Sequence, residues 1–293
     1  MIIVKLMGGL GNQMFQYAIG RRVSLLRNNA LKVDVSFLDE KNSNHISRKF
    51  ELDVFSSDIQ IATSEDLNKF TTVQKSKLKK GIQRMFPFSF PYHIMGEKTH
   101  GYNAEILNAP ENSLLIGYWQ TEKYFLPIQD IIRKDFIFQN PLQGLNRDVA
   151  DIIASCNSLS LHIRRGDYIH HKETSSFHGI CSDAYYSDAI ELIKSKVDNI
   201  QLFIFSDEPE WVKANMNFNA PATYIDNNIG EFNYIDMQLM SLCKHNIIAN
   251  SSFSWWGAWL NRNPEKIVVA PTKWFNDSSV NVNDIVPEGW RKL

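Results

Sequence analysis

Apolar runs and helix-like stretches alternate regularly in the second half of the chain, and this alternation constrains the fold more than any other feature. Short apolar runs typical of strands occur at 159–163, 200–205, 246–249 and 267–270. Helical periodicity occurs between or after them, at 183–197, 210–216, 232–243 and 253–260. Strands that alternate with helices at this rhythm form a parallel sheet, because each new strand must return to the same edge. We therefore predict an α/β domain with a parallel sheet.

A glycine-rich loop follows the first apolar run, which lies at 2–6. The loop has the sequence GGLGN at 8–12, and apolar residues at helical spacing come after it. Glycines let the backbone approach a ligand closely, and the free amides at a helix N-terminus favour an anion. Gly9, Gly11 and Asn12 are therefore candidate ligand-binding residues.

A turn-rich segment at 138–145 separates the two halves of the chain. Before it, a buried strand is predicted at 113–119 and a helix at 122–134. A chain of 293 residues is long enough for two domains of ordinary size. We predict one domain over 1–144 and a second over 145–293.

Two arginines stand directly after the predicted strand at 159–163. Polar and apolar residues alternate up to Ile163, and Arg164 and Arg165 follow. In open α/β sheets the ligand binds outside the carboxyl ends of the strands, and a guanidinium group matches the geometry of a phosphate. An anionic, phosphorylated ligand is the first hypothesis, and a solvated ion-pair cluster at a turn is the alternative. Successive side chains of a strand point to opposite faces, so we expect the two arginines to have different roles.

The composition argues against several classes of protein. A hydrophobic content of 44% and a charged content of 22% are typical of soluble globular proteins, and the apolar runs are far shorter than the ~20 residues that span a bilayer. Three widely spaced cysteines without a Cys-x-x-Cys motif indicate neither a disulfide framework nor a zinc site. A net charge of -1 gives no overall attraction to nucleic acid. The first residues do not read as a signal peptide, and we expect a cytoplasmic protein.

Three separated blocks of sequence resemble the GDP-fucose-dependent fucosyltransferases, specifically the bacterial α-1,2-fucosyltransferases of glycosyltransferase family 11. The blocks are GGLGNQMFQYA at 8–18, HIRRGDY at 162–168 and NSSFSWWGAWL at 250–260. The resemblance implies the GT-B fold, with two Rossmann-like domains whose parallel sheets face a cleft. It implies that the second domain binds GDP-fucose and that the first mainly binds the acceptor. The reaction would move L-fucose to the 2-hydroxyl of a galactose unit of a glycan, with inversion and without a metal or other cofactor.

The resemblance also assigns roles to individual residues. Arg164 would contact the diphosphate and stabilise the leaving group, while His162 and Asp236 would contact guanine, whose N1 and N2 hydrogens suit a carboxylate. The other residues expected to bind GDP-fucose are Gly9, Gly11, Asn12, Asn250, Ser251 and Ser252. Asp167 and Glu173 are the candidates for a catalytic base, and a dissociative transition state with little base assistance is the alternative.

Two other functions stay open at this point. Asp34 lies roughly twenty positions after the glycine loop and imitates the fingerprint of an NAD-type oxidoreductase, although the loop lacks the last small residue of that motif. A noncatalytic module that binds a glycan or a nucleotide sugar is the other alternative. Asp207 and Glu208 resemble the metal-binding Asp-x-Asp of other glycosyltransferases, but capping of the following helix is the simpler explanation.

A basic segment at 69–86 contains no acidic residue among its cations, and apolar residues are interleaved with them. The cations are Lys69, Lys75, Lys77, Lys79, Lys80 and Arg84. Such a helix could lie on an anionic membrane surface, and a simple solvated face is the alternative. We retain peripheral contact with a membrane as a hypothesis.

Aromatic residues cluster in two places. Tyr118 and Trp119 either stack on a sugar ring or belong to the core, and the core is favoured. Trp255, Trp256 and Trp259 are predicted to be core residues.

Overall fold

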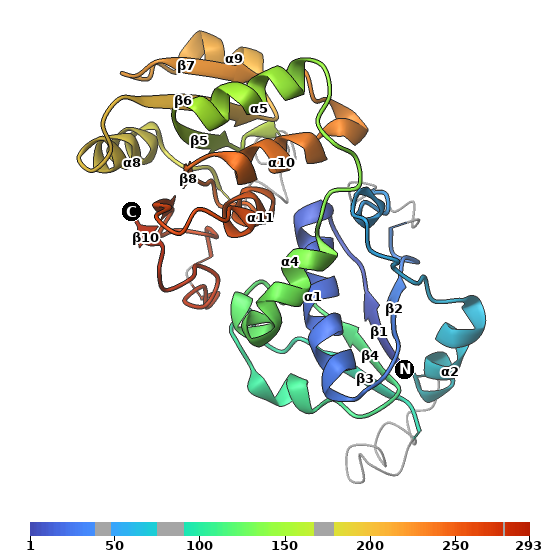
Figure 1. Cartoon of the computed structure of the whole chain (residues 1–293). Helices are drawn as coiled ribbons and strands as arrows, with labels where there is room; N and C mark the ends of the chain where they lie inside the picture. The colour runs from blue at the N-terminus through green and yellow to red at the C-terminus, as the bar shows by residue number, and fades with distance from the viewer. Residues whose placement is uncertain (39–47, 75–90, 167–178, 278) are drawn as a thin grey trace. The chain divides into compact units, whose positions relative to one another are not determined.

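Parallel sheets organise both parts of the chain. The computed structural model describes residues 1–38, 48–74, 91–166, 179–277 and 279–293, apart from the side chains of 71–74. The chain forms two units, 1–139 with 283–285 and 140–282 with 286–293 (Figure 1). The sequence places the boundary at Gly144 instead of Gln139, and it gives no sign that 283–285 belong to the first unit.

The first unit contains a four-stranded parallel sheet with the strand order β2-β1-β4-β3. The strands are β1 (Ile2–Lys5), β2 (Leu31–Asp34), β3 (His93–Gly96) and β4 (Ser113–Ile116). The α-helices are α1 (Leu10–Leu26), α2 (Ser64–Gln74) and α4 (Gln129–Asp135), and the short 3-10 helices are η1 (Leu52–Val54), η3 (Ala104–Asn108), η4 (Glu122–Tyr124) and η5 (Leu126–Ile128).

Two sequence predictions in this unit are wrong in part. The helix predicted at 122–134 is broken into η4, η5 and α4, because Pro127 lies in the first turn of η5 and has no N–H for a continuous helix. The strand predicted at 113–119 ends at Ile116, and Trp119 has a positive φ of 57° that does not fit a strand.

The second unit contains a six-stranded parallel sheet with the order β10-β9-β8-β5-β6-β7. The strands are β5 (Asn157–Ile163), β6 (Ile200–Ser206), β7 (Ala222–Ile225), β8 (His245–Ile247), β9 (Val268–Ala270) and β10 (Arg291–Lys292). The helices are α5 (Leu145–Ser155), α8 (Asp183–Lys194), α9 (Pro209–Asn215), α10 (Tyr234–Leu242), α11 (Ser252–Leu260) and the 3-10 helix η6 (Gly230–Phe232). The predicted alternation and parallel pairing are confirmed, whereas α5, β7 and β10 were not predicted.

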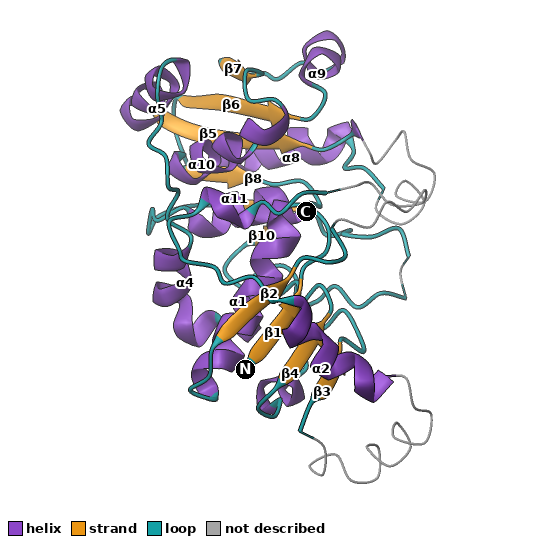
Figure 2. Cartoon of the chain, turned by 90° about the vertical axis from the view of Figure 1, so that its right-hand side faces the viewer, coloured by secondary structure: helices purple, strands orange, loops and turns teal. Residues whose placement is uncertain are grey.

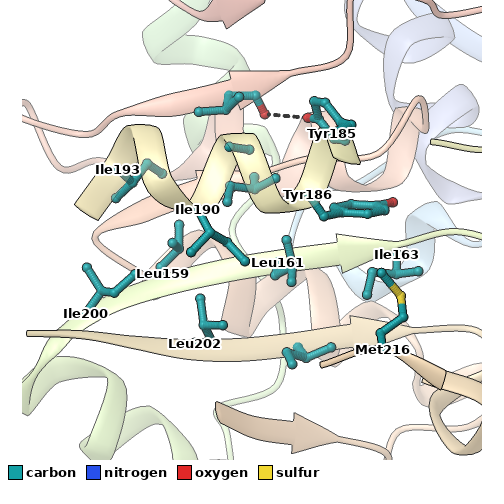
Figure 3. Packing of buried hydrophobic residues seen from close by; sticks show 14 of the residues in the cluster. Leu159, Leu161, Ile163, Tyr185, Tyr186, Ile190, Ile193, Ile200, Leu202 and Met216 are labelled. Atoms are coloured by element: carbon teal, nitrogen blue, oxygen red, sulfur yellow. Dashed lines mark hydrogen bonds between the residues drawn. The ribbon is translucent and has the colours of Figure 1, made fainter. Parts of the chain in front are cut away.

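Helices cover both faces of the second sheet (Figure 2). On one face Leu159, Leu161 and Ile163 of β5 pack against the side chains of α8 (Figure 3). On the other face Phe203 and Phe205 of β6 pack against α5 and α10. Because side chains alternate along β5, the polar residues between its leucines face the α10 side.

The tryptophans of α11 are core residues, as predicted. Trp255 and Trp256 are completely buried, and Trp259 is 3% exposed. In the part of the chain that the structure describes, no helix combines the length and the apolar character needed to cross a bilayer.

Candidate functional site

Four neighbouring strands of the second unit end in polar residues at one edge of the sheet. The strands β8, β5, β6 and β7 are parallel and adjacent, so their carboxyl ends lie side by side. The polar residues there are Arg164 and Arg165 after β5, Asp207 and Glu208 after β6, Asn227 and Asn228 after β7, and Asn250, Ser251 and Ser252 after β8. This edge, which we call the arginine edge, is where an open α/β sheet binds its ligand.

The two arginines have different surroundings. Arg164 places Nη1 at 3.3 Å from Oδ2 of Asp207. Arg165 places Nε at 3.4 Å from Glu208, and its guanidinium lies 3.1 Å from the centre of the Trp211 ring. Arg165 is therefore packed into the unit through an aromatic face and an ion pair. The contacts of the two arginines differ, and their separate roles stay a prediction.

Asp207 and Glu208 do not cap the following helix, so the capping explanation is wrong. The helix α9 has no side-chain cap at its N-terminus. Asp207 instead pairs with Arg164 and accepts the backbone N–H of Arg165 at 3.0 Å. A Cβ at Gly166 would lie 2.6 Å from Oδ2 of Asp207, so any larger residue there would displace this carboxylate. Among the described residues, no group of three or more His, Cys, Asp or Glu side chains could hold a metal ion.

His162 is buried on the α10 side of β5 and is only 4% exposed. Burial, with a contribution from the charge of Arg164, lowers the pKa of its imidazole to about 3, so the ring is neutral. No described residue forms a hydrogen bond with its Nδ1, and the ring of Phe253 lies 5.9 Å away between centroids. An unsatisfied buried nitrogen costs roughly 1–3 kcal/mol, which a hydrogen-bonding ligand would offset.

Asp236 lies in the first turn of α10 and is connected to the arginine edge through Asn228. The side-chain amide of Asn228 donates a hydrogen bond of 2.8 Å to Oδ1 of Asp236. Burial raises the pKa of Asp236 to about 7, and the hydrogen bond from Asn228 lowers it only in part. A carboxylate in this setting is suited to a ligand that brings N–H donors.

The loop after β8 presents the N-terminus of α11. Ser251 caps this helix, since its Oγ accepts the N–H of Phe253 at 3.3 Å, and Ser252 is the first helical residue. The amide of Asn250 donates to the carbonyl oxygen of Trp274 at 3.1 Å, so this side chain has a structural role. A phosphate near this loop would therefore meet the helix N-terminus and the serines more readily than the amide of Asn250.

The predicted glycine loop lies in the first unit, at the carboxyl end of β1. Gly8 has a φ of 75°, and Gly9 precedes the first residue of α1. The N–H of Leu10, the first of the helix, donates at 2.9 Å to Oε2 of Glu51. Asn12 accepts a hydrogen bond of 2.7 Å from Gln120. A carboxylate of the protein thus accepts the first amide of α1, and binding of GDP-fucose by Gly9, Gly11 and Asn12 stays a prediction.

A second carboxylate holds the end of β4 in the same way. Glu97, which follows β3, accepts the N–H of Tyr118 at 2.7 Å and that of Trp119 at 3.1 Å, and burial raises its pKa. Trp119 is 2% exposed and belongs to the core, whereas Tyr118 is 37% exposed. We call the surroundings of Glu51 and Glu97 the carboxylate edge. Sequence reasoning missed both glutamates, because their partners lie far along the chain or are backbone groups.

Some predicted residues lie outside the described part of the chain. Asp167 and Glu173, the candidate bases, are among them, as is 75–90 in the basic segment. Lys69 is described and pairs with Glu65 at 3.7 Å. Membrane contact through this segment stays a prediction.

Comparisons with known proteins show the family of the chain. Glycosyl transferase family 11 matches residues 1–293. The chain is 36% identical over 300 residues to an alpha-1,2-colitosyltransferase of Escherichia coli, covering 100% of this chain and 98% of the relative. It is 33% identical over 303 residues to the O-antigen biosynthesis glycosyltransferase WbnK of Escherichia coli, covering 98% and 99%.

The fold is also that of a solved glycosyltransferase. The fucosyltransferase NodZ from Bradyrhizobium superposes on the chain with a TM-score of 0.50 at 12% sequence identity, and the match covers 96% of each chain. This likeness, with the two parallel-sheet units, identifies the fold as GT-B. The chain belongs to glycosyltransferase family 11.

Proposed function

We propose that the chain transfers L-fucose from GDP-fucose to the 2-hydroxyl of a galactose unit in a glycan, with inversion, giving an α-1,2 linkage. The observation that carries this proposal is the arginine edge, where a partly buried guanidinium and a helix N-terminus occur together and Asn228 connects the edge to the carboxylate of Asp236. Membership of glycosyltransferase family 11 favours glycosyl transfer over the oxidoreductase alternative.

Arg164 is proposed to stabilise the departing GDP. Cleavage of the bond between fucose and the β-phosphate places negative charge on the phosphate while the sugar gains oxocarbenium character. Donors already aimed at that charge lower the barrier, since they need no reorganisation during the reaction. The guanidinium fork of Arg164, together with Ser251, Ser252 and the amides that begin α11, would supply them. Arg164 would then share its ion pair with Asp207 between the carboxylate and the diphosphate.

The guanine base is proposed to lie near Asp236 and His162. A carboxylate can accept the adjacent N1 and N2 hydrogens of guanine, and adenine presents no such pair of donors. His162 would satisfy its buried Nδ1 through the ligand or its hydration. His162 points to the α10 side of β5, and Asp236 lies in the first turn of α10, so both residues are on the same side of the sheet.

Colitose is a second candidate for the donor sugar, because the chain is 36% identical to a colitosyltransferase. Colitose is L-fucose without its 3-hydroxyl, so a GDP-colitose donor would use the same nucleotide site. The proposed roles of Arg164 and Asp236 are the same for both sugars. The choice between them depends on contacts to the sugar ring.

The acceptor is proposed to bind the first unit. The carboxylate edge suits a neutral galactoside better than a phosphate, because Glu51 and Glu97 already accept the backbone N–H groups. Gly9, Gly11 and Asn12 are retained as predicted ligand-binding residues of this unit. For deprotonation of the 2-hydroxyl we retain Asp167 and Glu173 as candidate bases, beside a dissociative mechanism with little base assistance.

A direct assay tests the proposal. The purified chain is incubated with GDP-fucose or GDP-colitose and galactose-terminated glycans in the presence of EDTA, and products are identified by mass spectrometry and the linkage by NMR. We expect an α-1,2-linked product that forms without added metal. Binding of GDP without any transfer would support a noncatalytic module instead, and binding of NAD but not GDP would contradict the proposal.

A further inference from the structure

Among the described residues, one oxygen of the Asp236 carboxylate accepts a hydrogen bond and the other does not. Asn228 donates from Nδ2 to Oδ1 of Asp236 at 2.8 Å. No described residue forms a hydrogen bond with Oδ2. The carboxylate therefore has a fixed orientation and a remaining capacity to accept hydrogen bonds.

Asn228 is itself fixed by two other asparagines. Asn146, in the first turn of α5, donates to Oδ1 of Asn228 at 2.8 Å, and Asn228 donates back to Oδ1 of Asn146 at 3.1 Å. Asn227 donates to Oδ1 of each of them at 3.1 Å. Because Oδ1 of Asn228 already accepts two bonds, its amide nitrogen must be the group that faces Asp236. We call these three residues the amide cluster.

The amide cluster orients Asp236 without neutralising it. An arginine or lysine in the place of Asn228 would hold the carboxylate as firmly but would compete with any ligand for its charge. A neutral amide leaves the charge available to a ligand's N–H groups, and hydrogen bonds to a charged group are about twice as strong as neutral ones.

We propose that Asn228 is a positioning residue for selection of the nucleobase, and that it aims Asp236 at the adjacent ring N–H and exocyclic amine of guanine. This inference rests on the proposed function, in which a GDP-sugar is the donor. It adds to that function a residue, Asn228, that contributes to the choice of guanine over other bases without touching the nucleotide.

Inosine diphosphate supplies the matched probe, since it is GDP without the 2-amino group. Titration of the full-length chain by calorimetry at about pH 8 measures both affinities. We expect wild type to bind GDP at least tenfold more tightly than inosine diphosphate, roughly the value of one hydrogen bond to a charged group. In Asn228→Ala we expect the affinity for GDP to fall about tenfold and the affinity for inosine diphosphate to fall much less. The preference for GDP then drops below about threefold.

Asn227→Ala is the control, because Asn227 belongs to the amide cluster but has no hydrogen bond to Asp236 among the described contacts. It should keep the preference for GDP within about twofold of wild type. If the role of the cluster were purely structural, the affinities for GDP and inosine diphosphate would fall equally and their ratio would stay unchanged. Melting temperatures of all variants identify any that fail to fold. For that case Asn146→Ala, which removes two of the three hydrogen bonds that join Asn228 to the other asparagines, should reduce the preference to an intermediate value.

An unchanged preference for GDP over inosine diphosphate in a folded Asn228→Ala would overturn the inference. If that variant does not fold, an unchanged preference in Asn146→Ala would do the same. A loss of preference in Asn227→Ala as large as that in Asn228→Ala would also overturn it. A wild-type chain that binds GDP and inosine diphosphate equally would overturn it while leaving the proposed donor class intact. A wild-type chain that binds neither would overturn the proposed function as well.

Discussion

The two units have the same type of sheet, but the carboxyl ends of their strands carry opposite chemistry. In the first unit Glu51 and Glu97 accept hydrogen bonds from backbone N–H groups at the ends of β1 and β4. In the second unit Arg164 and Arg165 follow β5, and the N-terminus of α11 adds further donors. Carboxylates accept backbone amides at the first edge, whereas at the second edge they pair with two arginines beside a helix N-terminus.

This comparison shows why a glycine-rich loop is weak support for a phosphate site. The loop after β1 has the sequence and the helix N-terminus that such a site needs, but Glu51 lies at the first amide. A bound phosphate there would meet the half-buried carboxylate of Glu51. The arginine edge has no glycine fingerprint, and its character depends on guanidinium groups instead.

The largest expected effect is that of Arg164→Lys. The variant keeps the charge but loses the planar fork, and we expect kcat to fall by roughly a hundredfold or more, as for loss of one preorganised donor. Arg165→Lys loses the stacking on Trp211 and should mainly lower the melting temperature, with a smaller loss of kcat. Near-normal turnover in Arg164→Lys beside an inactive, folded Arg165→Lys would reverse the assignment.

Asp236→Asn should weaken GDP-fucose binding by about tenfold to a hundredfold, because it removes a charged acceptor. Wild-type affinity should rise between about pH 6 and pH 8, since the pKa of free Asp236 is about 7 and only the ionised form accepts both guanine hydrogens. GDP-fucose is the appropriate ligand because its diphosphate does not titrate in this range. Calorimetry across pH should show a flat profile for Asp236→Asn; the same slope in both proteins would show that another group titrates.

Asp236→Asn should weaken ligand binding but raise the stability of the fold at high pH. The folded-state pKa of Asp236 lies above its ordinary value of 3.8, so the folded chain binds more protons than the unfolded chain between these values. Stability from this group is therefore present at low pH and is lost as the pH rises through about 7. Asp236→Asn should melt a few degrees higher than wild type at about pH 8 and show no such gain at about pH 4. A variant less stable than wild type at high pH would contradict the assigned environment.

The smallest expected effect is that of Glu51→Gln on nucleotide binding. Glutamine still accepts the N–H of Leu10, so the loop should keep its shape, and GDP affinity should stay within about twofold of wild type. If the glycine loop were the phosphate site, removal of the carboxylate would relieve repulsion. A GDP affinity that rises about tenfold in Glu51→Gln, measured by calorimetry, would then contradict the proposal that the phosphate binds at the arginine edge.

The sequence predicts much of the second unit because its signals are local. Alternation along β5 and the position of Arg164 at the strand end follow from a few neighbouring residues, and both agree with the structure. Long-range contacts could not be predicted in this way. The pairing of Asp207 with Arg164 joins residues that are far apart in the sequence, and its proximity to Pro209 made a helix cap the simpler explanation.

Two further differences have equally specific causes. The strand β7 was not predicted because it has only four residues, and most of them are partly or fully exposed, so the sequence shows no apolar run there. The helix at 122–134 was predicted from spacing alone, although Pro127 interrupts its backbone hydrogen bonds. Asn228 carried no signal in the sequence, since its meaning depends on contacts with Asn146 and Asp236.

The central proposal is that the arginine edge, more than the glycine loop, binds the nucleotide, and hydrogen exchange of the full-length chain with and without GDP tests it most directly. We expect GDP to slow exchange in peptides that cover 160–166, 226–238 and 248–254, and to leave 8–16 unchanged when no acceptor is present. Protection confined to 8–16, with none at the ends of β5 and β8, would contradict the claim.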